Sequence, residues 1–325
     1  MKPVIGCLGA GRMGRGIAVV FAFAGHQVVV VDFKEREAAA FDALAAEARA
    51  EIRSTLEILA RIGQLAPEQV ATIAERVTIV SRQEAPTALP RCDLIFEGMP
   101  EILALKQAAL AEASKLAGAG PIIASTTSTI LVDDLAGSIE HPGRFLNAHW
   151  LNPAFLVPLI ELSPGRQTAP EVTARMKALL EGIGKVPVVC AARPGFIVPR
   201  IQTLAMNEAA RMVEEGVASA EDIDKAVIYG FGFRFAVLGL LEFIDWGGGD
   251  ILHHASRYLV EALGDVRYAA PDIIATNMRE GRIGMKTGQG FMNYEGVDQA
   301  AYREQRLAAF AAALRAMGLA REPVV

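Results

Sequence analysis

The sequence predicts an α/β fold, with a doubly wound, mostly parallel sheet followed by an all-helical C-terminal part. Two observations support this prediction. Short apolar runs alternate with helical stretches up to about residue 190, which is typical of a parallel sheet covered by helices. After Arg193-Pro194-Gly195 the pattern changes to helical periodicity with few strand signals. We therefore expect two domains, residues 1–192 and 193–325, as the length of 325 residues also favours.

The first βαβ unit is the most regular part of the pattern. Val4–Leu8 is a short apolar run that ends at a glycine turn, and Gly14–Gly25 has helical spacing. Val28–Val31 is β-branched throughout and ends at Asp32. The order is therefore strand, glycine turn, helix and strand.

The rest of the N-terminal domain repeats the alternation. Glu35–Ile62 is alanine-rich and charged on one face, which predicts one or two long helices. Further strands are expected at the remaining apolar runs, which are Val77–Val80, Leu94–Phe96, Ile122–Ala124, Phe145–Ala148, Leu159–Leu162 and Val186–Cys190.

The helical C-terminal domain contains long apolar faces. Ile223–Phe235 and Val237–Ile244 are two of them, and Tyr302–Met317 predicts one alanine-rich helix. Apolar helical faces of this extent often pack against a second subunit. We therefore expect a homodimer.

Composition narrows the class of protein. Hydrophobic residues make up 52% and charged residues 21%, with a net charge of −5, which predicts a globular chain that binds neither nucleic acid nor an anionic membrane. Ile17–Gly25 is too short to cross a bilayer, which takes about 20 residues. The N-terminus has no signal-peptide pattern, so we expect a soluble cytoplasmic protein. The three cysteines form no CxxC pair, which predicts buried thiols. The adjacent His253-His254 lacks the partners that a metal site needs.

The turn after the first strand matches the dinucleotide-binding pattern GxGxxG. Its residues are Gly9, Ala10, Gly11, Arg12, Met13 and Gly14. The first glycine permits the tight turn, the second lets a pyrophosphate approach the backbone, and the third lets helix and strand pack closely. The N-terminus of the helix then offers free N–H groups to the phosphates. A glycine turn that binds nothing is the alternative, and the strand and helix on either side argue against it.

Asp32 stands where the second strand ends. There it would accept hydrogen bonds from the ribose hydroxyls and repel a 2′-phosphate, so NAD is the predicted cofactor. Lys34 and Arg36 are close to Asp32 in sequence, and their positive charges would weaken the preference for NAD over NADP.

Three polar groups follow or interrupt later strands. Ser125–Thr129 comes after one strand, His149 after the next, and Glu161 lies within the apolar run beyond them. Oxidation of an alcohol needs a base for the hydroxyl proton, and imidazole suits neutral pH. A buried carboxylate would orient the ring, and Ser128 could donate to the substrate oxygen. A core histidine and an N-capping serine remain the alternative on spacing alone.

The chain resembles the 3-hydroxyacyl-CoA dehydrogenase family over nearly its whole length. Several motifs occur in the family's order, namely Gly9–Gly14 (GAGRMG), Pro100-Glu101 with Lys106, Ser125–Thr129, His149–Pro153 (HWLNP) with Glu161, Pro194–Arg200 (PGFIVPR) with Glu208-Ala209, Glu221–Lys225 (EDIDK) with Gly230, and Lys286–Phe291 (KTGQGF). The resemblance implies a Rossmann domain, a helical dimerisation domain and NAD-linked oxidation of a 3-hydroxy group.

The resemblance also implies roles for individual residues. The family's base falls on His149, its partner acid on Glu161, its serine on Ser128 and its asparagine on Asn152. Glu101 and Lys106 match positions near the nicotinamide half of the cofactor, and Lys286 matches a lysine near the active-site cleft.

Departures from the family pattern lie in the substrate region. Pro199 replaces the asparagine of GFxxNR, and Trp150-Leu151 stands where two phenylalanines are usual. Proline has no side-chain hydrogen bond and removes a backbone donor. Acyl-CoA members carry serine and lysine on the long helix for the CoA phosphates; here Arg61, Arg53 and Ser54 could serve, or could form a solvated face.

Three functions remain open from the sequence. The first is oxidation of a short-chain 3-hydroxyacyl-CoA, of the 3-hydroxybutyryl-CoA type. The second is oxidation of a free 3-hydroxy acid or related polar substrate, as in the L-gulonate, L-carnitine and pyridine-aldehyde dehydrogenases that share this framework. The third is a non-catalytic NAD-binding protein of the lens-crystallin kind.

Overall fold

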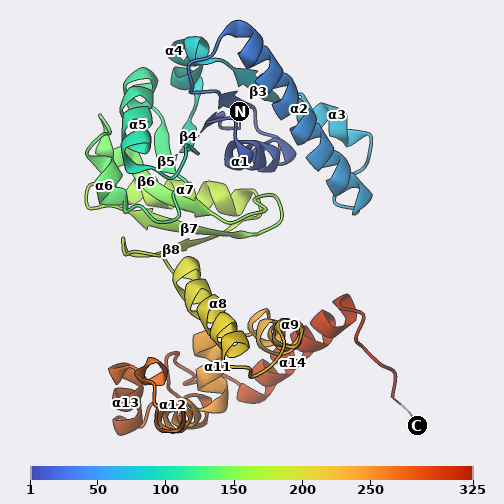
Figure 1. Ribbon diagram of the computed structural model, residues 1–325, viewed down its shortest axis with the longest axis vertical. Coiled ribbons are helices and arrows are strands. Elements are labelled where there is room, and N and C mark those ends of the chain that lie inside the picture. The colour runs from blue at the N-terminus through green and yellow to red at the C-terminus, as the bar shows by residue number, and fades with distance from the viewer. Residues whose placement is uncertain (1, 324–325) are drawn as a thin grey trace. The chain divides into compact units, whose positions relative to one another are not determined.

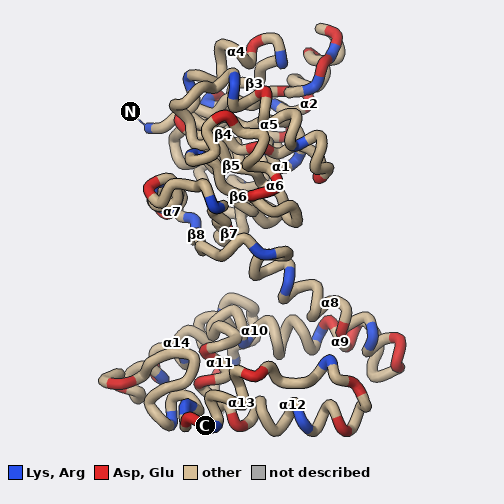
Figure 2. Tube along the Cα trace, turned by 90° about the vertical axis from the view of Figure 1, so that its left-hand side faces the viewer, with Lys and Arg blue, Asp and Glu red and all other residues tan. Residues whose placement is uncertain are grey.

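The computed structural model describes residues 2–323 and confirms the α/β class (Figure 1). The chain divides into two compact units, the first ending at Ala205 and the second beginning at Met206. This division falls within helix α8 (Val198–Glu214), and the domain boundary at residues 192/193 stays a prediction. Lys and Arg alternate with Asp and Glu along both units (Figure 2).

The first unit is built on an eight-stranded sheet with the order β3-β2-β1-β4-β5-β6-β7-β8. Every strand that the sequence predicts is present. The strands are β1 (Ile5–Leu8), β2 (Val28–Val31), β3 (Val77–Val80), β4 (Leu94–Glu97), β5 (Ile122–Ser125), β6 (Phe145–Trp150), β7 (Leu159–Pro164) and β8 (Val186–Val189). All neighbours are parallel except β6 and β7, which are antiparallel.

Helices cover both faces of this sheet, and each face has its own apolar core. One core joins the sheet to α1 (Arg12–Phe23), α2 (Ala38–Arg61), α3 (Gln69–Ala74) and α7 (Pro170–Gly182). The other joins it to α4 (Ala85–Ala88), α5 (Leu103–Ala117) and α6 (Val132–Ala136). The long α2 confirms the helix that the alanine-rich segment predicts. Cys7 and Cys92 are buried as free thiols, and Cys190 is half-buried.

The second unit is helical, as expected. It contains the rest of α8, α9 (Ala220–Ala226), a π-helix (Val227–Gly232), α10 (Phe233–Phe235), α11 (Leu240–Gly247), α12 (Gly249–Leu263), α13 (Asp272–Arg279) and α14 (Gln299–Ala316). Buried Asp245 accepts hydrogen bonds from the backbone N–H groups of Phe291 and Met292, which anchors the segment that contains Lys286.

Between residues 2 and 323, no single helix is long and apolar enough to cross a membrane. One bent pair, Ala220–Phe235 with Leu240–Gly247, meets the criteria of length and composition together, with 83° between its parts.

Candidate active site

The glycine turn between β1 and α1 has the geometry of a phosphate cradle. Gly9 has a φ of 97°, which favours glycine. A Cβ at Gly14 would lie 2.0 Å from the carbonyl oxygen of Gly9, so helix and strand are too close for any side chain. Gly11, by contrast, caps α1 and faces open space. A pyrophosphate can therefore approach Gly11 and the free N–H groups at the start of α1, so the turn fits a dinucleotide.

A groove runs from this turn to the end of β2. It is lined by the turn residues Gly9, Ala10 and Gly11, by Asp32, Lys34 and Arg36, and by Gly98, Met99 and Pro100 among others. Asp32 is 4% exposed, and Arg36 Nε donates a hydrogen bond of 2.5 Å to its Oδ2. One carboxylate oxygen of Asp32 is thus engaged, which leaves Oδ1 for a ribose hydroxyl. Of the other two motif residues, Arg12 is exposed and Met13 packs against the core beside the sheet.

Lys106 lies inside the protein. It is 1% exposed, and its Nζ donates to Glu97 Oε1 at 3.0 Å and to the carbonyl oxygen of Met99 at 3.0 Å. The same ammonium lies 3.4 Å from Glu101 Oε2. The buried ammonium of Lys106 is therefore paired with the carboxylates of Glu97 and Glu101. Glu97 is not among the residues predicted from the sequence; its signal is a single acid at the C-terminal end of an apolar strand.

Glu101 holds the loop after β5. Its Oε1 accepts hydrogen bonds from the Thr127 hydroxyl, from the N–H of Ser128 at 2.9 Å, and from the N–H and hydroxyl of Thr129 at 3.0 and 2.9 Å. Burial alone would raise the pKa of Glu101, but these bonds and the charge of Lys106 outweigh it and lower the pKa. The loop is thereby fixed with Ser128 exposed at its tip.

His149 and Glu161 form a buried pair. They lie opposite each other in the β6–β7 register, and the imidazole Nδ1 lies 2.7 Å from Glu161 Oε2. Glu161 Oε1 accepts from the N–H groups of Ile197 and Val198, each at 2.8 Å. The carboxylate accepts, so Nδ1 carries the proton and Nε2 is left with its lone pair. Because β7 runs antiparallel to β6, Glu161 inside β7 pairs directly with His149.

The charge on Glu161 is favoured by these contacts. Burial raises the pKa of a carboxyl group, but the hydrogen bonds from His149 and from the backbone of Val198 and Ile197 outweigh it, so the pKa of Glu161 lies below its usual value. Phe196 stacks on the imidazole, with ring centroids 5.3 Å apart and planes 6° apart. The backbone N–H groups that bind this acid could not be predicted from the sequence, because a backbone donor has no sequence signature.

The remaining predicted residues occupy different places. Ser128 follows β5, and His149 lies near the C-terminal end of the neighbouring parallel strand β6, so both lie at the same edge of the sheet, although no hydrogen bond joins them among the described residues. Arg61 is exposed at the last position of α2. Lys286 belongs to the second unit, where its Nζ lies 2.7 Å from Asp250 Oδ2. In residues 2–323 there is no group of three or more potential metal ligands.

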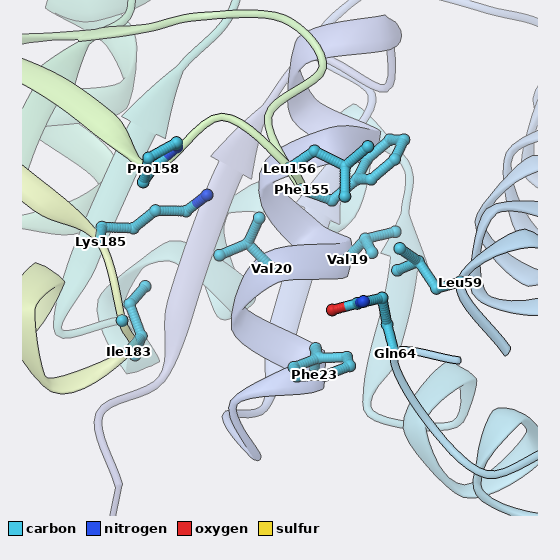
Figure 3. A pocket seen from close by; sticks show the side chains of 11 residues that line it. Val19, Val20, Phe23, Leu59, Gln64, Phe155, Leu156, Pro158, Ile183 and Lys185 are labelled. Atoms are coloured by element: carbon cyan, nitrogen blue, oxygen red, sulfur yellow. The ribbon is translucent and has the colours of Figure 1, made fainter. Parts of the chain in front are cut away.

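Asn152 lines a second groove, which lies between α1, α2 and the loop that joins β6 to β7. Its walls include Arg12, Gly16 and Val19 of α1, Ile52 and Thr55 of α2, and Asn152, Pro153, Ala154 and Phe155 of the loop. Val19 and Phe155 also line the neighbouring pocket at the far end of α1 (Figure 3). The two spaces therefore adjoin along α1.

Two family models match the chain. Residues 4–193 match the 3-hydroxyacyl-CoA dehydrogenase NAD binding domain, and residues 195–294 match the 3-hydroxyacyl-CoA dehydrogenase C-terminal domain. A 5-formyl-3-hydroxy-2-methylpyridine 4-carboxylate 5-dehydrogenase from Mesorhizobium japonicum is 31% identical over 291 residues, covering 89% of this chain and 90% of the relative. A probable 3-hydroxybutyryl-CoA dehydrogenase from Deinococcus radiodurans is 32% identical over 294 residues, covering 89% and 99%.

Solved structures of both kinds of dehydrogenase are similar to this chain. The 3-hydroxyacyl-CoA dehydrogenase of Archaeoglobus fulgidus aligns with a TM-score of 0.75 at 30% identity, covering 98% of this chain and 100% of the other. A 5-formyl-3-hydroxy-2-methylpyridine 4-carboxylic acid 5-dehydrogenase, described as an NAD⁺-dependent dismutase, aligns with a TM-score of 0.70 at 29% identity, covering 99% and 100%. Relatives of similar identity thus act on substrates with and without CoA.

Proposed function

Because the chain belongs to the 3-hydroxyacyl-CoA dehydrogenase family and has its NAD-binding domain, we propose that it oxidises a short-chain 3-hydroxyacyl-CoA to the 3-ketoacyl-CoA. The observation that supports this best is the His149–Glu161 pair, at 2.7 Å, with both carboxylate oxygens hydrogen-bonded. An oriented imidazole with a free Nε2 is the base that an alcohol oxidation needs.

The protein's own groups then have defined tasks. Bound NAD supplies the acceptor for the hydride that leaves C3 of the substrate. His149 Nε2 takes the hydroxyl proton as the C3–O bond becomes a carbonyl, and Glu161 stabilises the imidazolium that results. Ser128 donates a hydrogen bond to the substrate oxygen, and Asn152 lies three residues beyond the base to orient the acyl group. The cofactor is bound by Gly9–Gly14, Asp32 and Glu101.

The groove along α1 supports a substrate with a long arm. It begins at Asn152 and Arg12 and adjoins the pocket that reaches Phe23 and Leu59. We assign Arg61, at the exposed end of α2, to the CoA phosphates. Arg61 forms no ion pair with any other residue of the described part of the chain, so its guanidinium is available to an anion.

A free 3-hydroxy acid or a pyridine aldehyde is the second candidate substrate. Two observations favour it: Pro199 offers no side-chain hydrogen bond at the position of the family asparagine, and Arg53, the other cation of α2 considered for CoA, pairs with Glu57 at 3.1 Å. A smaller polar substrate needs neither residue as a phosphate anchor.

The test is NADH formation with the purified protein. S-3-hydroxybutyryl-CoA is compared with free 3-hydroxybutyrate, L-gulonate and L-carnitine, in wild type, H149A and R61A. Turnover of the thioester that H149A abolishes, with a raised KM in R61A, supports the proposal. Turnover of a free acid alone, unchanged in R61A, supports the second candidate. NAD binding without turnover of any substrate contradicts both and indicates a non-catalytic protein.

The proposed assembly is a homodimer formed by the helical unit. Exposed aromatic and aliphatic side chains on and beside its π-helix support this, among them Ile228 (52% exposed), Tyr229 (55%) and Phe231 (46%). Light scattering should give twice the chain mass; a monomer at micromolar concentration contradicts the assignment.

A further inference from the structure

Lys185 is a buried cation that the proposed mechanism does not use. It lies between α7 and β8 and is 8% exposed. Burial lowers its pKa, because the charged form loses contact with water. Within the described residues, no carboxylate lies within ion-pair distance of its ammonium.

The ammonium is held by backbone oxygens of a single loop. Lys185 Nζ donates to the carbonyl oxygens of Ala154 at 2.6 Å and Val157 at 2.8 Å. It also lies 5.6 Å from the centre of the Trp150 ring, within range of a cation–π interaction. Figure 3 shows the side chain extended beside Pro158, in a pocket whose other side chains, apart from Gln64, are apolar.

That loop connects the two catalytic strands. It runs from Trp150, next to His149, to Leu159, two residues before Glu161, and it contains Asn152. Within it, the N–H groups of Leu156 and Val157 both bond to the carbonyl oxygen of Pro153 at 3.0 Å, so it is a tight turn, and two of its carbonyls, those of Ala154 and Val157, are directed at Lys185. Beyond Lys185, the N–H of Val186 bonds to the carbonyl oxygen of Pro158 at 2.9 Å, which joins the loop to the start of β8.

An apolar side chain would fill this pocket without the desolvation penalty of a charge. A charge in this position does what an apolar residue cannot: it fixes the direction of two carbonyl groups. Those carbonyls belong to the loop that joins β6 to β7, and this loop contains Asn152 and begins two residues after His149.

We propose that Lys185 is a positioning residue for the reaction, acting through the β6–β7 loop to hold His149 and Asn152 in their reactive geometry. The inference rests on the proposed function, since it concerns the rate of that reaction. Lys185 does not line the cofactor groove; it lines the pocket that adjoins the Asn152 groove, and its ammonium is bound to the carbonyls of the loop.

The test compares K185M, K185R and the matched control K177M. Methionine keeps the length of the side chain and loses its donors, whereas arginine keeps charge and donors. Lys177 is half exposed on α7, and among residues 2–323 it pairs only with Glu181, at 3.7 Å, so K177M should behave as wild type. In K185M we expect kcat to fall about tenfold or more, as small misplacements of reacting groups do, with an unchanged Kd for NAD. K185R should recover part of the loss.

Hydrogen exchange at 20 °C or more below the melting temperature provides a second readout. In K185M the peptide that contains Leu156 and Val157 should exchange faster, while the peptide that contains Gly9–Gly14 should not change. A K185M variant with wild-type kcat, or with unchanged exchange in the loop, overturns the inference while the wild type remains active. A wild type that turns over no 3-hydroxy substrate instead removes the proposed function, and the inference with it.

Discussion

His149 and Glu161 lie directly opposite each other across the antiparallel strands β6 and β7, with 2.7 Å between Nδ1 and Oε2. The side chains of such a pair point to the same face of a sheet, so the register alone is enough to bring base and acid together. The N–H groups of Ile197 and Val198 occupy the second carboxylate oxygen. The dyad is therefore held from the sheet on one side and from the start of α8 on the other.

Replacing Glu161 by glutamine should lower kcat by at least about 100-fold, because an amide can neither satisfy all three donors nor stabilise an imidazolium. The measurement is steady-state NADH formation with the substrate identified in the comparison above. The Kd for NAD should stay at the wild-type value, since Glu161 does not line the cofactor groove. An E161Q variant with undiminished kcat would show that the pair is structural.

The same carboxylate should make stability depend on pH. The pKa of Glu161 is lower in the folded protein, so its contribution to stability is complete above the unfolded value of about 4.3 and is lost as pH falls through the folded pKa. Urea midpoints of wild type and E161Q should therefore differ most near neutral pH and converge in acid. A gap that stays constant down to the acid limit of folding would contradict the sign.

Glu101 should affect the chemical step more than the binding of the cofactor. Its Oε1 is occupied by donors from Thr127, Ser128 and Thr129, so E101A releases the loop that presents Ser128. We expect a fall in kcat of roughly tenfold or more with a small change in the Kd for NAD. A large rise in Kd with little change in kcat would instead assign Glu101 to the cofactor directly.

The two glycines of the turn should respond differently to alanine. At Gly14 the added Cβ would lie 2.0 Å from a backbone oxygen, so G14A should lower the melting temperature and weaken NAD binding together. At Gly11 nothing lies within 4 Å, so G11A should fold normally and weaken only NAD, whose pyrophosphate needs that space. Calorimetry of folding and titration with NAD separate the two effects; equal melting temperatures for G14A and wild type would contradict the close packing.

Arg36 should moderate the choice between NAD and NADP. Its guanidinium neutralises Asp32 at 2.5 Å and lies at the groove where a 2′-phosphate would sit. R36A should therefore increase the ratio of kcat/KM for NAD over NADP, and D32N should decrease it. A ratio that is unchanged in both variants would place the adenosine ribose elsewhere.

Local signals were sufficient for the elements and for the cofactor turn. The apolar runs predict all eight strands because a buried strand must be apolar along its own length. The GAGRMG turn is recognisable because each of its glycines is required by steric conditions within the turn itself. Lys106 shows the limit of such signals: the resemblance places it near the nicotinamide half of the cofactor, and the structure in addition buries it against Glu97 and the carbonyl of Met99. These partners lie only nine and seven residues before it, but it is the turn between β4 and α5 that directs them at its ammonium, and spacing along the chain does not show that turn.

The sequence by itself determined the eight strands, the helical nature of the second unit, the cofactor turn with Asp32, and the candidates His149, Glu161 and Ser128. Only the tertiary structure decided that β7 runs antiparallel to β6, that backbone N–H groups before α8 hold Glu161, and that Lys185 clamps the loop between the catalytic strands. The reason is physical. Periodicity and turn chemistry act over a few residues, whereas strand direction and the partners of a buried charge are set by contacts between segments far apart in the chain.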